Sequence, residues 1–221
     1  MSTGADKLKV DAVAYDFDGT LYDSFEGINS AFKKTSLLVH SVEVELNKKD
    51  IGPQLIQLYE NAFGKNKRDA FLNFQQHFRH FYDNACYNDG QLYPRTVEVL
   101  DKFYKSGIKQ YIVSNKPQKV LEKILLENNI DKYFIEVSGH PTGGATLNRK
   151  SDRLMTLLKR ELINPENLLL VGDTIEDLEM ADTNKCRFVH AAYGYGAVEK
   201  KCLSVSRIDE ILNFITDDEG C

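Results

Sequence analysis

The sequence predicts an α/β protein with a second, all-helical unit inserted near its start. Residues 10–17 are apolar almost without a break, which is typical of a strand buried on both faces of a parallel sheet. From Leu92 onward, strand and helix patterns alternate. Between these regions, residues 24–85 carry only helical patterns. We therefore expect a Rossmann-like, doubly wound parallel sheet core with an inserted α-helical domain.

The first strand ends in an acidic turn. Asp16 and Asp18 are one residue apart, and they share a face of the strand if the extended period of two persists that far. Gly19 follows, and it offers a turn in which backbone N–H groups can approach an anion. A ligand is expected to bind here.

The inserted unit is expected to be a small helical bundle. Ile28 and Phe32 indicate a first helix, the pair Gly52 and Pro53 opens a second, and aromatic residues three and four apart over 71–85 trace one face of a third. The predicted domains are residues 1–20 with 93–221 for the core and 21–92 for the insertion.

Elements of the core follow in alternation after the insertion. We expect helices at 96–105, 118–128, 151–161, 175–183 and 206–214, and strands at 108–113, 133–137, 168–171 and 187–190.

Composition excludes several function classes. The formal net charge is −5, so no global attraction to nucleic acid or an anionic membrane is expected. No apolar run reaches the roughly 18 residues that span a bilayer, and the polar start lacks the apolar stretch of a signal peptide. We expect a cytoplasmic protein that is a monomer or weak dimer.

The four cysteines show no CxxC spacing and are expected to be free thiols; they are Cys86, Cys186, Cys202 and Cys221.

Polar residues follow several predicted strands, and ligands in such sheets bind beyond the carboxyl ends of the strands. Carboxylates that meet there repel each other unless a cation compensates, and magnesium prefers oxygen ligands completed by a substrate phosphate. The sequence therefore predicts a Mg²⁺ site that takes a phosphoester. The residues that would meet at this edge are Asp16, Asp18, Ser114, Asn115, Lys150 and Asp173.

Each of these residues has an expected task. Asp16 is the candidate nucleophile, because an aspartate is ionised at neutral pH and can attack phosphorus. Asp18 is the candidate acid and base that protonates the leaving oxygen and then activates water. Ser114 and Asn115 would donate hydrogen bonds to the phosphoryl oxygens, and Lys150 would draw charge from them. Arg149, Lys116 and Lys119 are rivals for the lysine's role.

The motifs in order resemble the haloacid dehalogenase superfamily, in its phosphoglycolate-phosphatase-like branch with a helical cap after the first strand. The resemblance spans nearly the whole chain. Its four motifs match Asp16-Phe17-Asp18-Gly19-Thr20-Leu21, Val113-Ser114-Asn115-Lys116-Pro117, Lys150, and Val171-Gly172-Asp173-Thr174-Ile175-Glu176-Asp177.

This resemblance implies a magnesium-dependent phosphomonoesterase with an aspartyl-phosphate intermediate. The metal would be held by the Asp16 side chain, the Asp18 backbone carbonyl and Asp173, with Asp177 and Thr20 in support. In relatives, the loop that matches Gly52 and Pro53 looks into the active site, so this pair is a candidate substrate contact of the cap.

The chain departs from the family pattern at three places. Ser151 follows Lys150 where many relatives have proline, and Arg95 stands where glycine is frequent. In the stretch from Ala181 to Lys185, relatives tend to carry a second alanine and a glycine.

The expected substrate is a small phosphorylated metabolite: phosphoglycolate, with a nucleoside monophosphate or sugar phosphate nearly as well supported. Two alternatives stay open. One is a β-phosphoglucomutase-like phosphotransferase, and the other is a non-catalytic binding or regulatory protein with the same fold.

Overall fold

The computed structural model describes residues 8–52, 54–141 and 149–215. The chain divides into two compact units, Met1–Leu21 with Leu92–Cys221 (unit 1) and Tyr22–Gln91 (unit 2). The chain passes between them through a two-stranded ribbon of β2 (Tyr22–Asp23) and β3 (Gln91–Leu92). That unit 2 acts as a cap stays a prediction.

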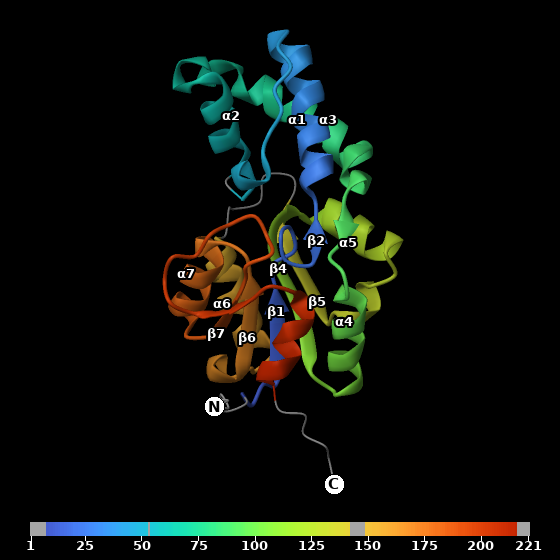
Figure 1. Cartoon of the computed structure of the whole chain (residues 1–221), viewed down its shortest axis with the longest axis vertical. Coiled ribbons are helices and arrows are strands. Elements are labelled where there is room, and N and C mark those ends of the chain that lie inside the picture. The colour runs from blue at the N-terminus through green and yellow to red at the C-terminus, as the bar shows by residue number, and fades with distance from the viewer. Residues whose placement is uncertain (1–7, 53, 142–148, 216–221) are drawn as a thin grey trace. The chain divides into compact units, whose positions relative to one another are not determined.

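Unit 1 is built on a six-stranded sheet with strand order β5-β4-β1-β6-β7-β8, in which every pairing is parallel. Helices flank the sheet (Figure 1). The predicted fold class is therefore confirmed. The strands are β1 (Ala12–Tyr15), β4 (Lys109–Pro117), β5 (Glu136–His140), β6 (Leu168–Gly172), β7 (Arg187–Ala191) and β8 (Leu203–Val205).

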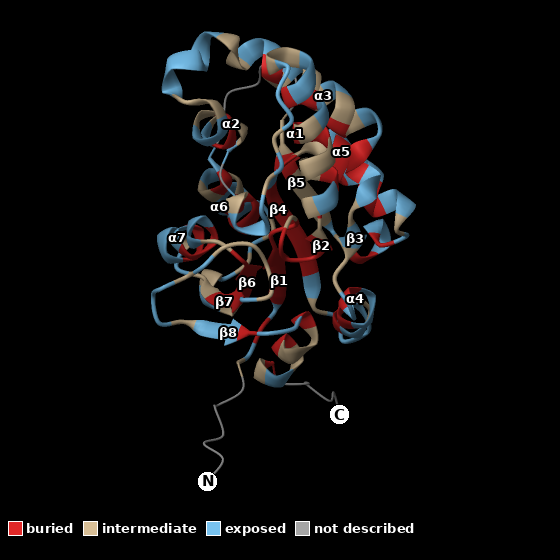
Figure 2. Cartoon of the chain, turned by 45° about the horizontal axis from the view of Figure 1, so that its top comes forward, coloured by how far each residue is buried: buried red, intermediate tan, exposed pale blue. Residues whose placement is uncertain are grey.

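The centre of this sheet is fully buried, as Figure 2 shows for β1 and β6. Ala12 and Ala14 of β1 face a core that is formed with leucines of α6 and α7. Because side chains alternate along a strand, Val13 and Tyr15 point to the opposite face, and both are buried as well. Burial on both faces explains the unbroken apolar run in the sequence. The helices of unit 1 are α4 (Thr96–Lys105), α5 (Gln118–Glu127), α6 (Lys150–Arg160) and α7 (Ile175–Asn184).

Unit 2 consists of α1 (Phe25–His40), α2 (Leu55–Phe63) and α3 (Phe71–Asn84), joined by short 3-10 turns. Aromatic rings fill its interior. Phe32 and Phe74 meet edge to face with their ring centroids 5.0 Å apart, and Tyr59 lies 4.9 Å from Phe74 in a similar geometry. The aromatic stripe of α3 is therefore mainly a core face, as the spacing predicts.

Two predicted elements differ from the structure, one in its bounds and one in its helix type. The strand expected at 133–137 begins only at Glu136, because Tyr133 ends a 3-10 turn, η4 (Asp131–Tyr133), and is buried there. The expected helix at 206–214 is a 3-10 helix, η6 (Ile208–Phe214), preceded by the unpredicted edge strand β8. Apolar periodicity does not distinguish these alternatives in segments this short.

The strand expected at 108–113 extends to Pro117 as β4, and its pairing with β5 shifts register between Val113 and Pro117. This irregularity falls on residues 114–116. A bulge re-aims side chains at the end of a strand, so it matters for the site below.

Other expectations concern thiols and membranes. Cys86, Cys186 and Cys202 are free thiols as predicted, and Cys221 lies outside the described residues. Among the helices that the structure describes, none has the length and apolar character needed to cross a bilayer.

The two helix-end departures from the family pattern both carry left-handed backbone. Arg95 precedes α4 with φ 69°, and Lys185 ends α7 with φ 59°. For a residue with a Cβ this conformation is about 1 kcal/mol or more higher in free energy than the right-handed one, whereas glycine adopts it freely.

Replacing Lys185 with glycine is therefore expected to stabilise the protein by about 1 kcal/mol, because the helix end keeps its geometry and loses the strain. Urea unfolding measures the change. The matched control is Lys123→Gly, an exposed position in the middle of α5, which should destabilise by about 1 kcal/mol. Equal destabilisation by both substitutions would contradict the strain at Lys185.

Candidate active site

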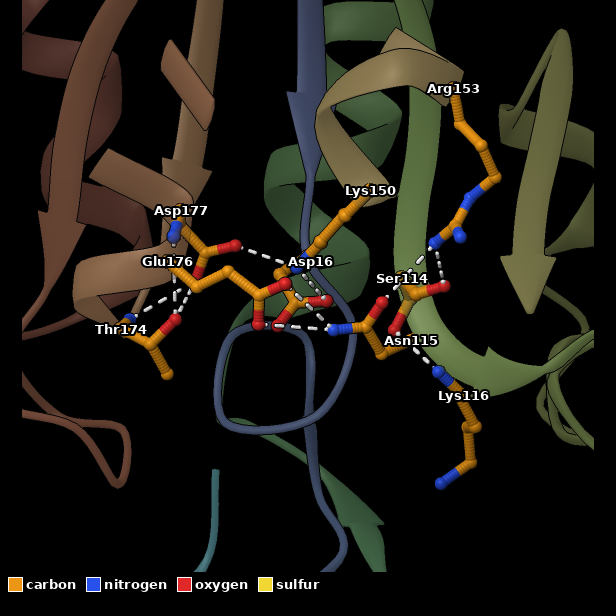
Figure 3. Close-up of polar contacts among 9 residues, drawn as sticks. All are labelled: Asp16, Ser114, Asn115, Lys116, Lys150, Arg153, Thr174, Glu176 and Asp177. Carbon is orange, nitrogen blue, oxygen red and sulfur yellow. Dashed lines mark hydrogen bonds and ion pairs between the residues drawn. The ribbon is translucent and has the colours of Figure 1, made fainter. Parts of the chain in front are cut away.

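The predicted site residues of unit 1 lie at the carboxyl edge of the sheet, and Figure 3 shows Asp16, Ser114, Asn115, Lys150 and Asp177 among them. Asp16 directly follows β1, and Ser114 and Asn115 lie in the last part of β4. Asp173 directly follows β6, and Lys150 is the first residue of α6. The rule that strand ends share one edge thus brings together residues more than 150 positions apart.

Three carboxylates form the centre of this site. Asp16, Asp173 and Asp177 are buried, and one oxygen of each lies within 4.8 Å of the others. The sequence named Asp177 only as a supporting residue, yet its carboxylate is part of the cluster. Asp18 is absent from this group of side chains, and its expected contribution to the metal was the backbone carbonyl.

Lys150 balances part of this charge. Its Nζ lies 2.8 Å from Asp16 Oδ1 and 2.6 Å from Asp177 Oδ1, and its side chain is only 3% exposed. Burial lowers the pKa of Lys150, but the two carboxylates outweigh burial and raise the pKa above its usual value. The rivals Arg149 and Lys119 are exposed. Lys150 is thus a permanent cation between two aspartates.

The carboxylates themselves are hard to ionise together. Burial raises the pKa of Asp16 to about 6, although Lys150 opposes the shift. Burial, with the charges of Asp16 and Asp177, raises the pKa of Asp173 to about 7. One lysine does not compensate three buried acids, so the site favours an additional cation.

One carboxylate oxygen of Asp173 accepts hydrogen bonds, and the other has no partner among the described residues. Its Oδ2 accepts hydrogen bonds from the backbone N–H of Tyr195 at 2.8 Å and of Gly196 at 3.3 Å. Its Oδ1 is buried and has no hydrogen-bond partner among the described residues. An unpaired carboxylate oxygen inside an acidic cluster fits a hard divalent cation, so the residues present suit Mg²⁺.

Asp177 is fixed by the start of α7. Thr174 is the N-cap, and its backbone N–H and Oγ1 donate to Asp177 Oδ2 at 3.0 and 2.7 Å. This capping box leaves Asp177 Oδ1 directed at Lys150. The same local sequence signal that begins the helix therefore aims the carboxylate.

Asp18 has a different partner. Lys116 Nζ lies 2.7 Å from Asp18 Oδ1, and the lysine side chain is 2% exposed against 24% for the aspartate. The Phe17 ring lies 5.8 Å from the same ammonium. The sequence treated Lys116 only as a rival of Lys150, whereas the structure pairs Lys116 with Asp18 and Lys150 with Asp16 and Asp177.

The bulge of β4 is tied to two helices. Asn115 Nδ2 donates to the Glu176 carboxylate at 3.1 and 3.2 Å. Arg153 Nη2 donates to the Ser114 carbonyl oxygen at 2.7 Å. Ser114 is buried, and its Oγ accepts from the Lys116 backbone N–H at 3.3 Å. The expected phosphate donors are thus held in place by residues that the sequence did not single out.

The remaining predicted residues are placed as follows. Thr20 is buried in unit 1, and its Oγ1 has no hydrogen-bond partner among the described residues. Gly52 lies in unit 2 with φ 116°. Pro53 lies outside the described residues, so the expected substrate role of this pair stays a prediction.

Sequence reasoning missed Arg153 and the segment 193–196, which binds Asp173, and it considered Lys116 only as a rival of Lys150. One signal was present for the segment: two glycines alternate with two tyrosines shortly after a strand, in Tyr193-Gly194-Tyr195-Gly196. Alternating glycines outside a regular element indicate close backbone approach. No comparable local signal marks Arg153, and nothing in the second motif indicates that its Lys116 pairs with Asp18.

Comparisons with known proteins agree with this geometry. Residues 13–191 match the family model of haloacid dehalogenase-like hydrolases. The chain is 29% identical over 212 residues to the phosphoglycolate phosphatase of Photobacterium profundum, covering 91% of this chain and 90% of that one. It is 25% identical over 195 residues to a 5'-nucleotidase of Pseudomonas aeruginosa, covering 87% of each.

A solved structure adds evidence on the fold alone. A haloacid dehalogenase-like hydrolase from Streptococcus pneumoniae superposes with a TM-score of 0.81 at 22% identity, covering 92% of this chain and 97% of that one.

The raised pKa of Asp173 predicts that, without divalent cations, the free energy of unfolding depends on pH. Native Asp173 binds its proton up to about pH 7, against 3.8 for the ordinary group. The native state therefore holds more protons than the unfolded state between these values, and its stability falls as pH rises through them. Asp173→Asn should stabilise the EDTA-treated protein by at least about 1 kcal/mol at pH 8 and by little at pH 4.

Denaturant unfolding in EDTA at the two pH values measures this difference. The control is Asp182→Asn on the exposed face of α7, which should change stability little at either pH. A destabilised Asp173→Asn variant at pH 8 would contradict the electrostatic cost.

Proposed function

Because the chain belongs to the haloacid dehalogenase-like hydrolase family, we propose that it is a magnesium-dependent phosphomonoesterase that forms an aspartyl-phosphate on Asp16. The observation that carries the proposal is the charge arrangement around Asp16. A buried nucleophile candidate is paired with one lysine and adjoins a carboxylate oxygen that lacks a partner. Such a site binds a cation together with a phosphoryl group.

The cation would be held by the side chains of Asp16 and Asp173 and by the Asp18 backbone carbonyl. When bound, Mg²⁺ supplies positive charge that offsets the negative charge of the phosphoryl oxygens. Asp177 would act through Lys150, which it holds 2.6 Å away. Thr20 would support the turn that carries Asp18.

In the first step, an Asp16 carboxylate oxygen forms a bond to phosphorus while the bond from phosphorus to the leaving oxygen breaks. Asp18 gives its proton to that oxygen. Lys150 and the donors around Ser114 and Asn115 stabilise the charge that develops on the phosphoryl oxygens. The products of this step are a free alcohol and the aspartyl-phosphate.

In the second step, Asp18 removes a proton from water as the water oxygen attacks phosphorus. The bond between phosphorus and Asp16 breaks, and inorganic phosphate leaves. Both aspartates return to their starting states. The exposed fraction of Asp18, larger than that of Asp16, suits a residue that must reach both a leaving group and a water molecule.

The proposed substrate is phosphoglycolate or a metabolite of similar charge. The Lys116 ammonium lies beside Asp18, on the side where the leaving group would be protonated. A cation at this place would attract a leaving group that carries its own carboxylate. The phosphoglycolate phosphatase relatives agree with this choice, and the 5'-nucleotidase relative keeps a nucleoside monophosphate as the second candidate.

Unit 2 is proposed to be the cap, with domain bounds near 21–92 and with Gly52 and Pro53 as its substrate contacts. A cytoplasmic location and a monomeric or weakly dimeric state also stay predictions.

The two alternative functions, a mutase and a non-catalytic protein, have less support. The mutase has no sequence feature of its own in the chain, and a non-catalytic protein would not need every catalytic position filled.

Asp16→Asn is expected to lower turnover by on the order of 10³-fold or more, because an amide oxygen does not form the phosphoenzyme. Phosphate release from p-nitrophenyl phosphate with Mg²⁺, and its loss in EDTA, measures the activity. Asp182→Asn serves as control and should keep full turnover. Full activity of Asp16→Asn would remove Asp16 as nucleophile, and Mg²⁺-independent release would remove the metal.

Lys116→Met is expected to raise the KM for phosphoglycolate about tenfold or more relative to the KM for p-nitrophenyl phosphate, since only the first leaving group is anionic. Steady-state kinetics with both substrates measures the ratio. Lys119→Met, on the exposed side of α5, should leave the ratio unchanged. An equal change for both substrates would argue against recognition of a carboxylate by Lys116.

A further inference from the structure

We propose that residues 193–196, termed the cradle loop, set the affinity of the site for its divalent cation by positioning Asp173 against the turn at residues 16–20. The inference rests on the proposed function, because it takes Asp173 to be a ligand of that cation. Nothing in the motif pattern assigns a role to this loop. Its residues are Tyr193, Gly194, Tyr195 and Gly196.

The loop engages one oxygen of Asp173 and leaves the other unpaired. Two successive backbone N–H groups, from Tyr195 and Gly196, donate to Oδ2. Because Oδ2 is held in this way, the carboxylate cannot rotate without losing both hydrogen bonds. Oδ1, which is buried and lacks a hydrogen-bond partner among the described residues, is thereby the oxygen left available to a cation.

The approach of the loop to Asp173 requires glycine. A Cβ on Gly194 would overlap the Gly19 carbonyl oxygen and the Asp173 Cβ and would lie 2.7 Å from Asp173 Oδ2. A Cβ on Gly196 would lie 2.5 Å from the Asp173 carbonyl oxygen and 3.0 Å from Thr174 Cα. Gly19 also has no room for a Cβ, which would overlap Asp173 Oδ2. Gly19 and Gly194 thus lie against the Asp173 side chain, and Gly196 lies against its backbone carbonyl.

The loop also binds the turn that carries the other proposed ligands. Tyr193 Oη donates to the Thr20 carbonyl oxygen at 2.8 Å, and its ring meets Tyr93 edge to face with centroids 4.8 Å apart. Gly194 lies against the Gly19 carbonyl oxygen. One short loop therefore contacts both halves of the proposed metal site, the turn after β1 and the residue after β6.

The base of the loop is tied to the sheet. The Ala192 backbone N–H donates to the Val205 carbonyl oxygen at 3.0 Å, and the Gly194 N–H donates to the Ala191 carbonyl oxygen at 2.9 Å. These bonds join the loop to β7 and β8. Partners that orient a ligand in this manner commonly change metal affinity by about 10- to 100-fold when they are removed.

The test uses Mn²⁺ as a spectroscopic substitute for Mg²⁺. Electron paramagnetic resonance counts free Mn²⁺ in titrations of the whole protein, so the Kd is obtained without turnover. Gly196→Ala should raise the Kd about tenfold or more, and Tyr193→Phe, which removes only the hydroxyl that reaches Thr20, should raise it several-fold. Tyr104→Phe is the matched control for loss of a tyrosine hydroxyl, since Tyr104 is exposed. Gly107→Ala is the control for backbone strain alone: Gly107 has φ 72° and lies before β4, so the substitution should lower stability and leave the Mn²⁺ affinity unchanged.

A kinetic readout separates positioning from general damage. In both loop variants, the Mg²⁺ concentration that gives half-maximal activity should rise, and saturating Mg²⁺ should restore most of kcat. Unchanged Mn²⁺ affinity in Tyr193→Phe and in folded Gly196→Ala would overturn the inference while leaving the proposed function intact. If Gly196→Ala does not fold, Tyr193→Phe decides alone. A wild-type protein that binds no Mn²⁺ would overturn both the inference and the proposed cofactor.

Discussion

The site depends on an electrostatic imbalance: three buried carboxylates meet around a single buried lysine. Lys150 pairs with Asp16 and Asp177 and leaves the charge of Asp173 uncompensated. In a medium of low dielectric constant, such an excess of negative charge raises pKa values and opposes folding. The same excess makes the site a good place for a divalent cation and, next to it, for a phosphoryl group. The excess negative charge thus lowers the stability of the protein at the place where it favours binding of a cation.

The parallel sheet makes this imbalance possible. Residues that follow β1 and β6 meet because the two strands are neighbours and run in the same direction. The N-terminal ends of α6 and α7 then add Lys150 and Asp177. Each side chain is also held locally, Asp177 by the capping box of Thr174 and Asp173 by backbone N–H groups. These hydrogen bonds hold the carboxylates in place, so that like charges stay close together although they repel each other.

The sequence predicted the fold and the centre of the site because their signals are local. Buried strands followed by polar residues located Asp16 and Asp173, and motif order selected Lys150. Contacts between residues far apart in the chain have no local sequence pattern that predicts them. Lys116 contacts Asp18 across 98 positions, and Arg153 contacts Ser114 from one turn inside α6. The type of the last helix and the edge strand β8 were missed for a related reason, since short segments at a sheet edge are decided by their neighbours.

A crystal structure with Mg²⁺ and beryllium fluoride, a mimic of a transferred phosphoryl group, tests this charge arrangement directly. We expect one Mg²⁺ ion bound by Asp16 and Asp173, with the beryllium attached to an Asp16 oxygen and a fluoride near Lys150. A structure in which Mg²⁺ binds elsewhere, or in which the mimic attaches to another residue, would contradict it.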